Sequence, residues 1–365
     1  MRPELQTPTL SPLVAGPAPV PLQLLTPQGE LLTSTPLISD AQARDGLRAM
    51  LLGRRFDERC VQLQRRGLMV TLAPGIGQEA CGVGSTLLLD RTRDWIVPQY
   101  REPAAQLHYG LPLVQAFLWH MGSPLGFVIH PGMKMLPFNA GVAGQIPHAV
   151  GLAWGFRIQK QDAAVVVHFG EGATSQGDFH ESINLAGVTK APVIFFCQNN
   201  QWAISTHASL QTASPSFAHK GLAYGVPGLL VDGNDLFAVA AAMRFALDRA
   251  RRGEGATLIE GVTYRLGMHT TADDGARCEP PGMRDEWRPK DPLIRLQAYL
   301  ERRQVLAAGE YDAMDRDIAA ELDEAWQQAQ SAVKNTVAES LHHVYAEMPP
   351  HLQAQLRAIE ESRDA

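Results

Sequence analysis

The sequence predicts an α/β fold with a mostly parallel sheet flanked by helices. Three observations support this fold class: apolar runs of strand length, helical patterns between these runs, and polar or glycine-rich loops that follow two of them. Continuous apolar runs are typical of strands that are buried on both faces of a parallel sheet. Strands that alternate with helices indicate βαβ units. The clearest apolar runs span residues 163–169, 192–197, 229–231 and 257–264.

The first elements of the predicted domain are a helix and a short strand. The helix begins near Asp40, which is a suitable N-cap. Its apolar stripe passes through Leu47, Met50 and Leu51 at helical spacing. Residues 95–97 form a compact apolar run, which predicts a buried strand.

A long loop is predicted in the middle of the chain. Residues 122–144 are rich in glycine and proline and show little periodicity. Long loops inside a globular chain are more often functional than idle. Further helices are predicted over 110–121 and 178–188, and one helix follows the apolar run at 229–231 and extends to about Arg252. Two more are predicted in the C-terminal part, at 293–300 and 311–341.

The N-terminal segment is predicted to be an extended arm. Eight of the 25 prolines fall within the first 40 residues, and proline disfavours a helix both at its own position and before it. The arm lacks the basic start and apolar core of a signal peptide, and Arg2 is its one basic residue. We expect it either to be mobile or to lie across another subunit. The predicted organisation is an arm over 1–39, an α/β domain over 40–300 and a helical segment over 301–365.

Composition limits the classes of function. The 365 residues are 45% hydrophobic and 19% charged, with a net charge of −6, which excludes disorder of the whole chain. This charge gives no reason to expect nucleic acid or a membrane as a main partner. No apolar run reaches the roughly 18 residues of a membrane-spanning helix. Four cysteines without a Cys-x-x-Cys pair predict free thiols and a cytoplasmic protein.

Two loops carry the candidate chemistry. The first runs from Gly170 to Asp178 directly after a predicted strand, and its glycines let the backbone approach a bulky anion. Its continuation into a helix favours phosphate binding at the helix start. Glu171 lies within this loop, and a carboxylate that faces phosphate is explained by a divalent metal such as Mg²⁺ between them.

The second loop contains Asn199 and Asn200 and follows the next predicted strand. Asn200 lies 29 residues after Glu171, which is about the length of one βαβ unit. Both loops are therefore expected at the carboxyl ends of neighbouring parallel strands, where open α/β sheets bind ligands. The Glu171 carboxylate, the Asn200 amide oxygen and a backbone carbonyl then form a small set of oxygen ligands.

The string from Gly170-Glu171-Gly172 to Asn199-Asn200 resembles the thiamine-diphosphate binding motif. The region around it resembles the α subunit of the first component of 2-oxo acid dehydrogenases, and most closely the branched-chain enzymes. The resemblance extends from about Asp40 to Leu300. It implies a thiamine-diphosphate-binding fold. Its other landmarks are Gly77-Gln78-Glu79-Ala80, Pro98-Gln99-Tyr100-Arg101-Glu102, Ala143-Gly144-Gln145-Ile146-Pro147, Val231-Asp232-Gly233-Asn234-Asp235 and the segment from Tyr264 to Asp274.

The resemblance also implies roles for individual residues. Glu171, the Asn200 side chain and the backbone carbonyl of Trp202 would bind Mg²⁺. His269 would be the catalytic histidine that assists reductive acylation of a lipoyl group, because histidine suits proton delivery near neutral pH. The remaining implied cofactor contacts are Gln99, Tyr100, Arg101, Ala140, Val142 through its backbone, Gly170, Gly172, Ala173 through its amide, and Arg265.

Several positions depart from the family pattern. Gln198 stands where the family often has a basic residue that helps to hold the diphosphate. Arg101 and Arg265 would then have to supply more of the positive charge that binds it. Met268 replaces a frequent second histidine. Asn139 and Gly144 stand where some relatives bind K⁺, so no K⁺ site is expected, and Thr270 stands where mitochondrial relatives are phosphorylated on serine, a control that is not expected here.

The resemblance implies a divided active site. Thiamine diphosphate would supply the electron sink for decarboxylation of a 2-oxo acid. The glutamate that activates its ring is not placed on this chain and is expected on a β subunit, in an α₂β₂ assembly that docks on a lipoyl-bearing acyltransferase. The predicted substrate is the branched 3-methyl-2-oxobutanoate. Pyruvate or acetoin dehydrogenase α subunits remain alternatives, and a non-catalytic subunit that binds Mg²⁺ and phosphate is an alternative of another class.

Overall fold

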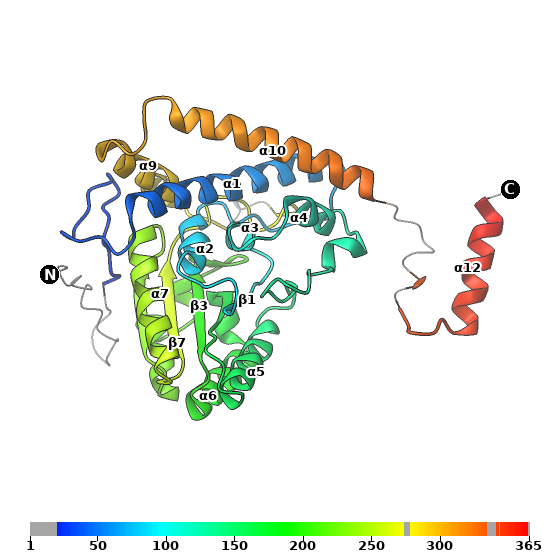
Figure 1. The fold of residues 1–365 in the computed structure, drawn as a ribbon, viewed down its shortest axis with the longest axis horizontal. Helices are drawn as coiled ribbons and strands as arrows, with labels where there is room; N and C mark the ends of the chain where they lie inside the picture. The colour runs from blue at the N-terminus through cyan, green and yellow to red at the C-terminus, as the bar shows by residue number, and fades with distance from the viewer. Residues whose placement is uncertain (1–19, 274–277, 334–340, 343, 364–365) are drawn as a thin grey trace.

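The chain folds around one parallel sheet, as predicted (Figure 1). The computed structural model describes residues 20–273, 278–333, 341–342 and 344–363. The five strands lie in the order β1-β2-β3-β7-β6, and every neighbouring pair is parallel. They are β1 (Trp95–Val97), β2 (Val165–Gly170), β3 (Val193–Asn199), β6 (Gly228–Asp232) and β7 (Thr257–Val262), and a two-stranded hairpin of β4 (Trp202–Ala203) and β5 (Thr206–His207) follows β3.

Helices cover both faces of this sheet. The α-helices are α1 (Asp40–Arg65), α2 (Glu79–Thr86), α3 (Pro103–Tyr109), α4 (Leu113–His120), α5 (Gln145–Ile158), α6 (Gly177–Thr189), α7 (Leu236–Arg251), α8 (Met283–Trp287), α9 (Pro292–Arg302), α10 (Glu310–Ala332) and α12 (Pro350–Arg363). Short 3₁₀ turns include η1 (Pro124–Phe127), η2 (Glu171–Ser175) and η4 (Ala218–Tyr224).

Alternate residues of the strands divide the core into two layers, as the period of two of a strand requires. Val166 and Ile194 point to the layer that contains α1, α2, α7, α9 and α10. Val165 and Phe195 point to the layer that contains α5 and α6. Both layers are apolar, which explains why the strand sequences read as continuous apolar runs.

Two helix boundaries differ from the prediction. Ser39 rather than Asp40 is the N-cap of α1, because its hydroxyl accepts the Gln42 amide while the Gln42 side chain accepts the Ser39 amide. This reciprocal arrangement is a capping box. The helix predicted over 110–121 is present as α4 but begins later, at Leu113, because Gly110 ends the preceding helix α3 with φ 115°.

The described part of the N-terminal arm packs on its own chain, which neither predicted alternative anticipated. Leu22 pairs with Val231 beside β6, and Leu25 is fully buried. The backbone amides of Leu24 and Leu25 both donate to Asp235 at 2.6 Å. The arm therefore extends the core at the open edge of the sheet.

Helix α10 lies along α1 at the top of the view in Figure 1. Its inner face is buried in the same layer as α1, and ion pairs such as Arg55–Asp315 (2.7 Å) join the two helices. The sequence predicts that this helix continues to Leu341. This is wrong at Val333, because α10 ends at Ala332 and Val333 is extended. Val337 lies outside the described residues. In the described part of the chain, no helix is long and apolar enough to cross a membrane.

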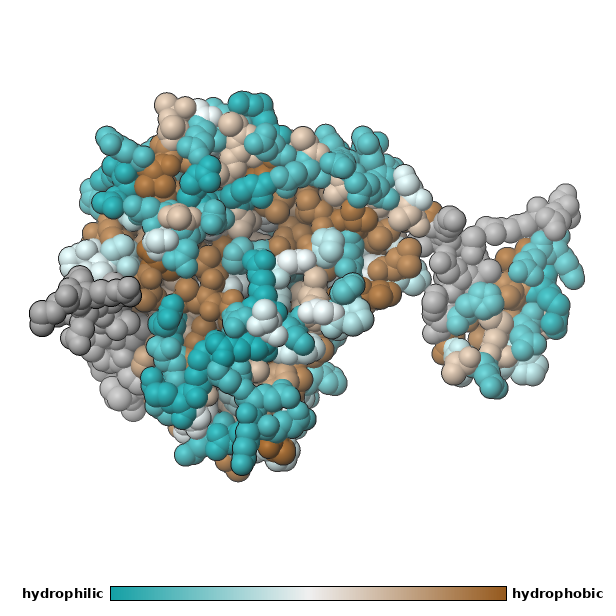
Figure 2. Space-filling model, viewed as in Figure 1, coloured by the Kyte–Doolittle hydropathy of each residue, from teal (hydrophilic) through white to brown (hydrophobic). Residues whose placement is uncertain are grey.

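Large apolar side chains are exposed in several places in the described part of the chain, including two groups. One group surrounds η1, where Leu125, Phe127 and Val128 are 46–63% exposed, and Figure 2 shows brown atoms along this rim beside α4. The other group lies on the neighbouring helices α5 and α6, with Ile158 and Val188 more than 60% exposed. Exposed apolar side chains that gather in one place are candidates for a surface that contacts another molecule.

Candidate active site

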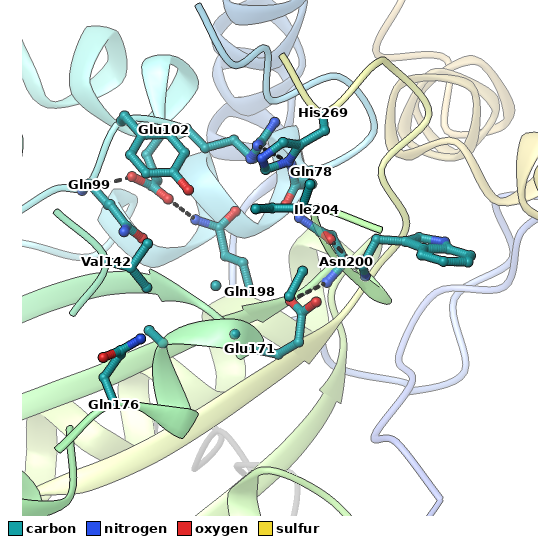
Figure 3. Close-up of a pocket in the computed structure, with 17 residues that line it drawn as sticks. Gln78, Gln99, Glu102, Val142, Glu171, Gln176, Gln198, Asn200, Ile204 and His269 are labelled. Atoms are coloured by element: carbon teal, nitrogen blue, oxygen red, sulfur yellow. Dashed lines mark hydrogen bonds between the residues drawn. The ribbon is translucent and has the colours of Figure 1, made fainter. Parts of the chain in front are cut away.

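The candidate site lies where four parallel strands end at their carboxyl ends (Figure 3). The segment after β1 contributes Gln99 to Glu102, and the turn after β2 contributes Glu171. Asn200 follows β3, and His269 lies in the loop after β7. Neighbouring strands β2 and β3 thus bring the two predicted loops together, because parallel strands present their carboxyl ends at one edge of the sheet.

These segments surround a cavity of about 250 Å³. Eleven of the predicted residues line it: Gln99, Tyr100, Arg101, Val142, Gly170, Glu171, Gly172, Ala173, Asn200, Trp202 and His269. Two predicted residues do not. Ala140 lines an adjacent cavity, which shares Tyr100 and His269 with the first. Arg265 lies behind His269, so its predicted contact with a cofactor stays a prediction.

The predicted metal ligands meet at one corner of the cavity. The Asn200 amide donates to Glu171 Oε2 at 3.3 Å, and Asn200 Oδ1 accepts the Trp202 amide at 3.1 Å. The Trp202 carbonyl accepts the Arg265 guanidinium at 3.3 Å. Burial raises the pKa of Glu171, and a divalent cation beside it would oppose that shift. A carboxylate, an amide oxygen and a carbonyl are ligands that Mg²⁺ prefers.

His269 is held by two guanidinium groups. Arg101 and Arg265 lie 2.9 and 3.0 Å from its Nδ1. Because guanidinium nitrogens only donate, Nδ1 is the acceptor and the ring proton is on Nε2. Burial, helped by both arginines, lowers the pKa of His269 to about 4. The ring is therefore neutral near pH 7 and can deliver a hydrogen bond only through Nε2.

Glu102 and Gln198 form a polar pair in the cavity wall. Gln198 Nε2 donates to Glu102 Oε1 at 3.0 Å, and the Gln99 amide donates to Glu102 Oε2 at 2.8 Å. Burial raises the pKa of Glu102 to about 7. At position 198 the cavity wall thus carries a neutral amide that contacts a carboxyl group.

A family model described as "Dehydrogenase E1 component" matches residues 47–338. The chain belongs to the dehydrogenase E1 component family. The match covers the five strands and every residue of the cavity described above, so the assignment includes the candidate site.

Relatives of two substrate classes are similarly close to this E1 chain. The 3-methyl-2-oxobutanoate dehydrogenase subunit alpha of Mycobacterium tuberculosis is 40% identical over 315 residues, which cover 84% of this chain and 83% of the relative. The pyruvate dehydrogenase E1 component subunit alpha of Acholeplasma laidlawii is 38% identical over 307 residues, or 84% of this chain and 89% of the relative. That of Bacillus subtilis is 36% identical over 336 residues, covering 91% and 90%. The chain is thus an E1 α subunit of a 2-oxo acid dehydrogenase, and identity alone leaves its substrate open.

Six lining residues of this E1 chain have no role in the sequence prediction: Gln78, Glu102, Gln176, Gln198, Ala203 and Ile204. Gln78 and Glu102 lie within the landmark motifs, Gln198 directly precedes Asn199, and Ala203 and Ile204 follow Trp202, so their position in the sequence was a usable signal. Gln176 lies in the first loop, three residues beyond the last predicted contact. Its side chain gave no signal of its own.

The cavity of this E1 chain fits an anionic ligand. Gln78 Nε2 and Gln99 Nε2 are buried donors for which the described residues offer no hydrogen-bond acceptor. A Cβ at Gly170 would meet nothing within 4 Å, so the backbone is open to the cavity there. Unsatisfied buried donors and an accessible loop backbone are suited to phosphate oxygens.

Proposed function

We propose that this chain is the α subunit of a branched-chain 2-oxo acid dehydrogenase and acts on 3-methyl-2-oxobutanoate. It binds thiamine diphosphate and Mg²⁺ and requires a β subunit. The observation that carries the proposal is the corner of the cavity where Glu171, Asn200 and Trp202 present three kinds of oxygen beside unsatisfied donors. An oxygen-ligated cation next to an anion cradle suits a diphosphate bound through Mg²⁺.

The chain's own residues hold and orient the cofactor. Glu171, Asn200 Oδ1 and the Trp202 carbonyl would hold Mg²⁺, while Arg101 and the amide of Ala173 would bind phosphate oxygens. Arg101 is suited to this because its guanidinium is always charged and carries several donors, although two of its nitrogens also contact the Pro74 carbonyl and His269. The Val142 backbone would contact the aminopyrimidine ring. When bound, thiamine diphosphate supplies the electron sink for decarboxylation.

His269 acts at the reacting end of the cavity. It lines both the main cavity and the adjacent one, and its available proton is on Nε2. We assign it the delivery of that proton during transfer of the acyl group to the lipoyl arm of an acyltransferase component. A histidine in this position contributes by general acid–base catalysis.

A β subunit completes the site. The family resemblance implies that the glutamate which activates the thiamine ring lies on this β subunit. Val142, at the cavity, is 44% exposed, and the apolar groups around η1 and on α5 and α6 are exposed as well. Burial of these surfaces would supply the main favourable free energy of association. We therefore infer an α₂β₂ assembly; a cytoplasmic location stays a prediction.

The adjacent cavity favours an apolar substrate side chain. It measures about 360 Å³ and touches the main cavity at Tyr100 and His269. Its remaining lining includes Val70, Leu72 and Trp119, which are apolar. Discrimination between a methyl and an isopropyl group needs only a few such contacts, worth about 1–3 kcal/mol.

Co-expression with the β subunit tests the proposal. Decarboxylation of 3-methyl-2-oxobutanoate and of pyruvate is measured with thiamine diphosphate and Mg²⁺, for the α chain alone and for the complex. We expect activity only in the complex and a higher kcat/KM for the branched acid. A preference for pyruvate would leave the proposed mechanism intact but change the substrate assignment to pyruvate, in agreement with the pyruvate dehydrogenase relatives. Cofactor binding without turnover of either acid would favour a non-catalytic subunit.

A further inference from the structure

Glu102 is a buried carboxyl group without a cationic partner. It lies at the N-cap of α3, is 4% exposed and lines the main cavity. Its two oxygens accept the Gln99 amide and the Gln198 side chain, and both of these donors are neutral. Among the described residues, no ion pair to Glu102 is present. A buried carboxylate is costly when it has no countercharge.

The charged and titratable groups around Glu102 do not supply that countercharge. The Arg101 guanidinium is directed to the Pro74 carbonyl at 2.9 Å and to His269, and its charge lowers the pKa of Glu102 by less than burial raises it. Cys81 on α2 is a buried thiol, and Glu171 after β2 adds a second carboxyl group to the same cavity. Gln198, on β3, is neutral.

The phosphate oxygens of a diphosphate in this cavity would add negative charge, part of which a divalent cation at Glu171 would offset. Like charges in a poorly solvated site cannot both remain ionised without a large cost, so the group with the higher pKa takes up a proton. A protonated carboxyl group then has an O–H that can donate to an anion, whereas a carboxylate only accepts.

We propose that Glu102 takes up one proton from solvent when a diphosphate ligand enters the cavity, and that its carboxyl group then donates a hydrogen bond to the ligand. Glu102 is thereby a further ligand-binding residue, with Gln198 as its positioning partner. The identity of the ligand rests on the proposed function. The step balances, because one carboxylate gains one proton and no other bond forms or breaks.

The expected signature is a proton count that depends on pH. A group with a pKa of about 7 is about one-tenth ionised at pH 6 and about nine-tenths ionised at pH 8. Proton uptake by Glu102 therefore rises from about 0.1 to about 0.9 per site over this range. Ligand affinity falls as the pH rises above 7, approaching tenfold per pH unit.

Calorimetry of the full chain in complex with its β subunit tests this. Thiamine diphosphate is titrated in the presence of Mg²⁺ at pH 6, 7 and 8, in two buffers with different ionisation enthalpies. The variant Glu102→Gln keeps an acceptor and the shape of the side chain but cannot titrate. Subtraction of its proton uptake removes the contribution of the ligand's own phosphate. We expect a difference of about 0.1 proton per site at pH 6 and about 0.9 at pH 8.

A second variant protects the test against a folding defect. Gln198→Arg places a cation next to Glu102 and should keep the carboxylate ionised, so its proton uptake should match that of Glu102→Gln. Equal uptake by the wild type and both variants would overturn the inference while leaving the proposed function intact. Absence of Mg²⁺-dependent binding by the wild type at every pH would overturn both.

Discussion

Asp235 joins the N-terminal arm to the core, and its removal should be strongly destabilising. The residue is fully buried and is the N-cap of α7. One carboxylate oxygen accepts the amides of Phe237 and Ala238 at 2.9 and 3.1 Å, and the other accepts the amides of Leu24 and Leu25 at 2.6 Å. The Asp235→Ala variant leaves four backbone donors without this acceptor.

The magnitude follows from these contacts. Loss of the cap costs about 1 kcal/mol. Each arm amide left unsatisfied in a buried position costs about 1–2 kcal/mol, so the free energy of unfolding should fall by about 3–5 kcal/mol. Urea unfolding measures this fall, and hydrogen exchange should show loss of protection at Leu24 and Leu25. The exposed Asp45 on α1 provides a matched control, since Asp45→Ala should change stability by less than about 0.5 kcal/mol. A loss below about 1 kcal/mol for Asp235→Ala, with the two arm amides still protected, would refute the reasoning.

Two further predictions concern helix packing and catalysis. A Cβ at Gly53 would lie 2.6 Å from the Cβ of Ala104, so Gly53→Ala should lower the free energy of unfolding by about 1–3 kcal/mol. Gly151→Ala, which meets nothing within 4 Å on α5, should instead raise it by up to about 1 kcal/mol; loss of stability in both variants would contradict this packing argument. His269→Ala should reduce acylation of a lipoyl substrate more than decarboxylation coupled to an artificial electron acceptor. Equal loss of both rates would exclude the role assigned to His269.

The strands were predictable because strands that are buried on both faces have continuous apolar sequences. Residues 163–169 and 192–197 read as nearly continuous apolar runs, and the sheet contains both strands as neighbours. The proximity of Glu171 and Asn200 then follows from topology alone. Most of the other predicted residues that line the cavity were named from the family resemblance and not from topology.

Helix α2 was not predicted, because its stability comes from tertiary packing. Its sequence Glu-Ala-Cys-Gly-Val-Gly-Ser-Thr has no polar face, and all eight residues are buried. A Cβ at Gly84 would lie 2.6 Å from Val239 Cγ1, so a glycine allows α7 to approach closely. Helix propensity disfavours glycine, so the local sequence predicts that this segment is not a helix.

The arm and Glu102 show a second limit of sequence reasoning. Prolines indicate an extended segment, but the acceptor that fixes the arm, Asp235, lies more than 200 residues away. Glu102 belongs to a motif that the sequence singled out, yet its unusual environment depends on Gln198, 96 residues further along the chain. Both features result from contacts between distant residues, and no local pattern reports them.

The central claim is that Glu171 holds a divalent cation that fixes a diphosphate in the cavity. Binding of thiamine diphosphate to the complex with the β subunit, measured with and without Mg²⁺, tests it most directly. We predict that Mg²⁺ strengthens binding and that Glu171→Gln weakens the Mg²⁺-dependent affinity by at least about 100-fold. The exposed Glu181→Gln on α6 should leave the affinity unchanged. Equal affinity of the wild type and Glu171→Gln in the presence of Mg²⁺ would contradict the assignment of the metal corner.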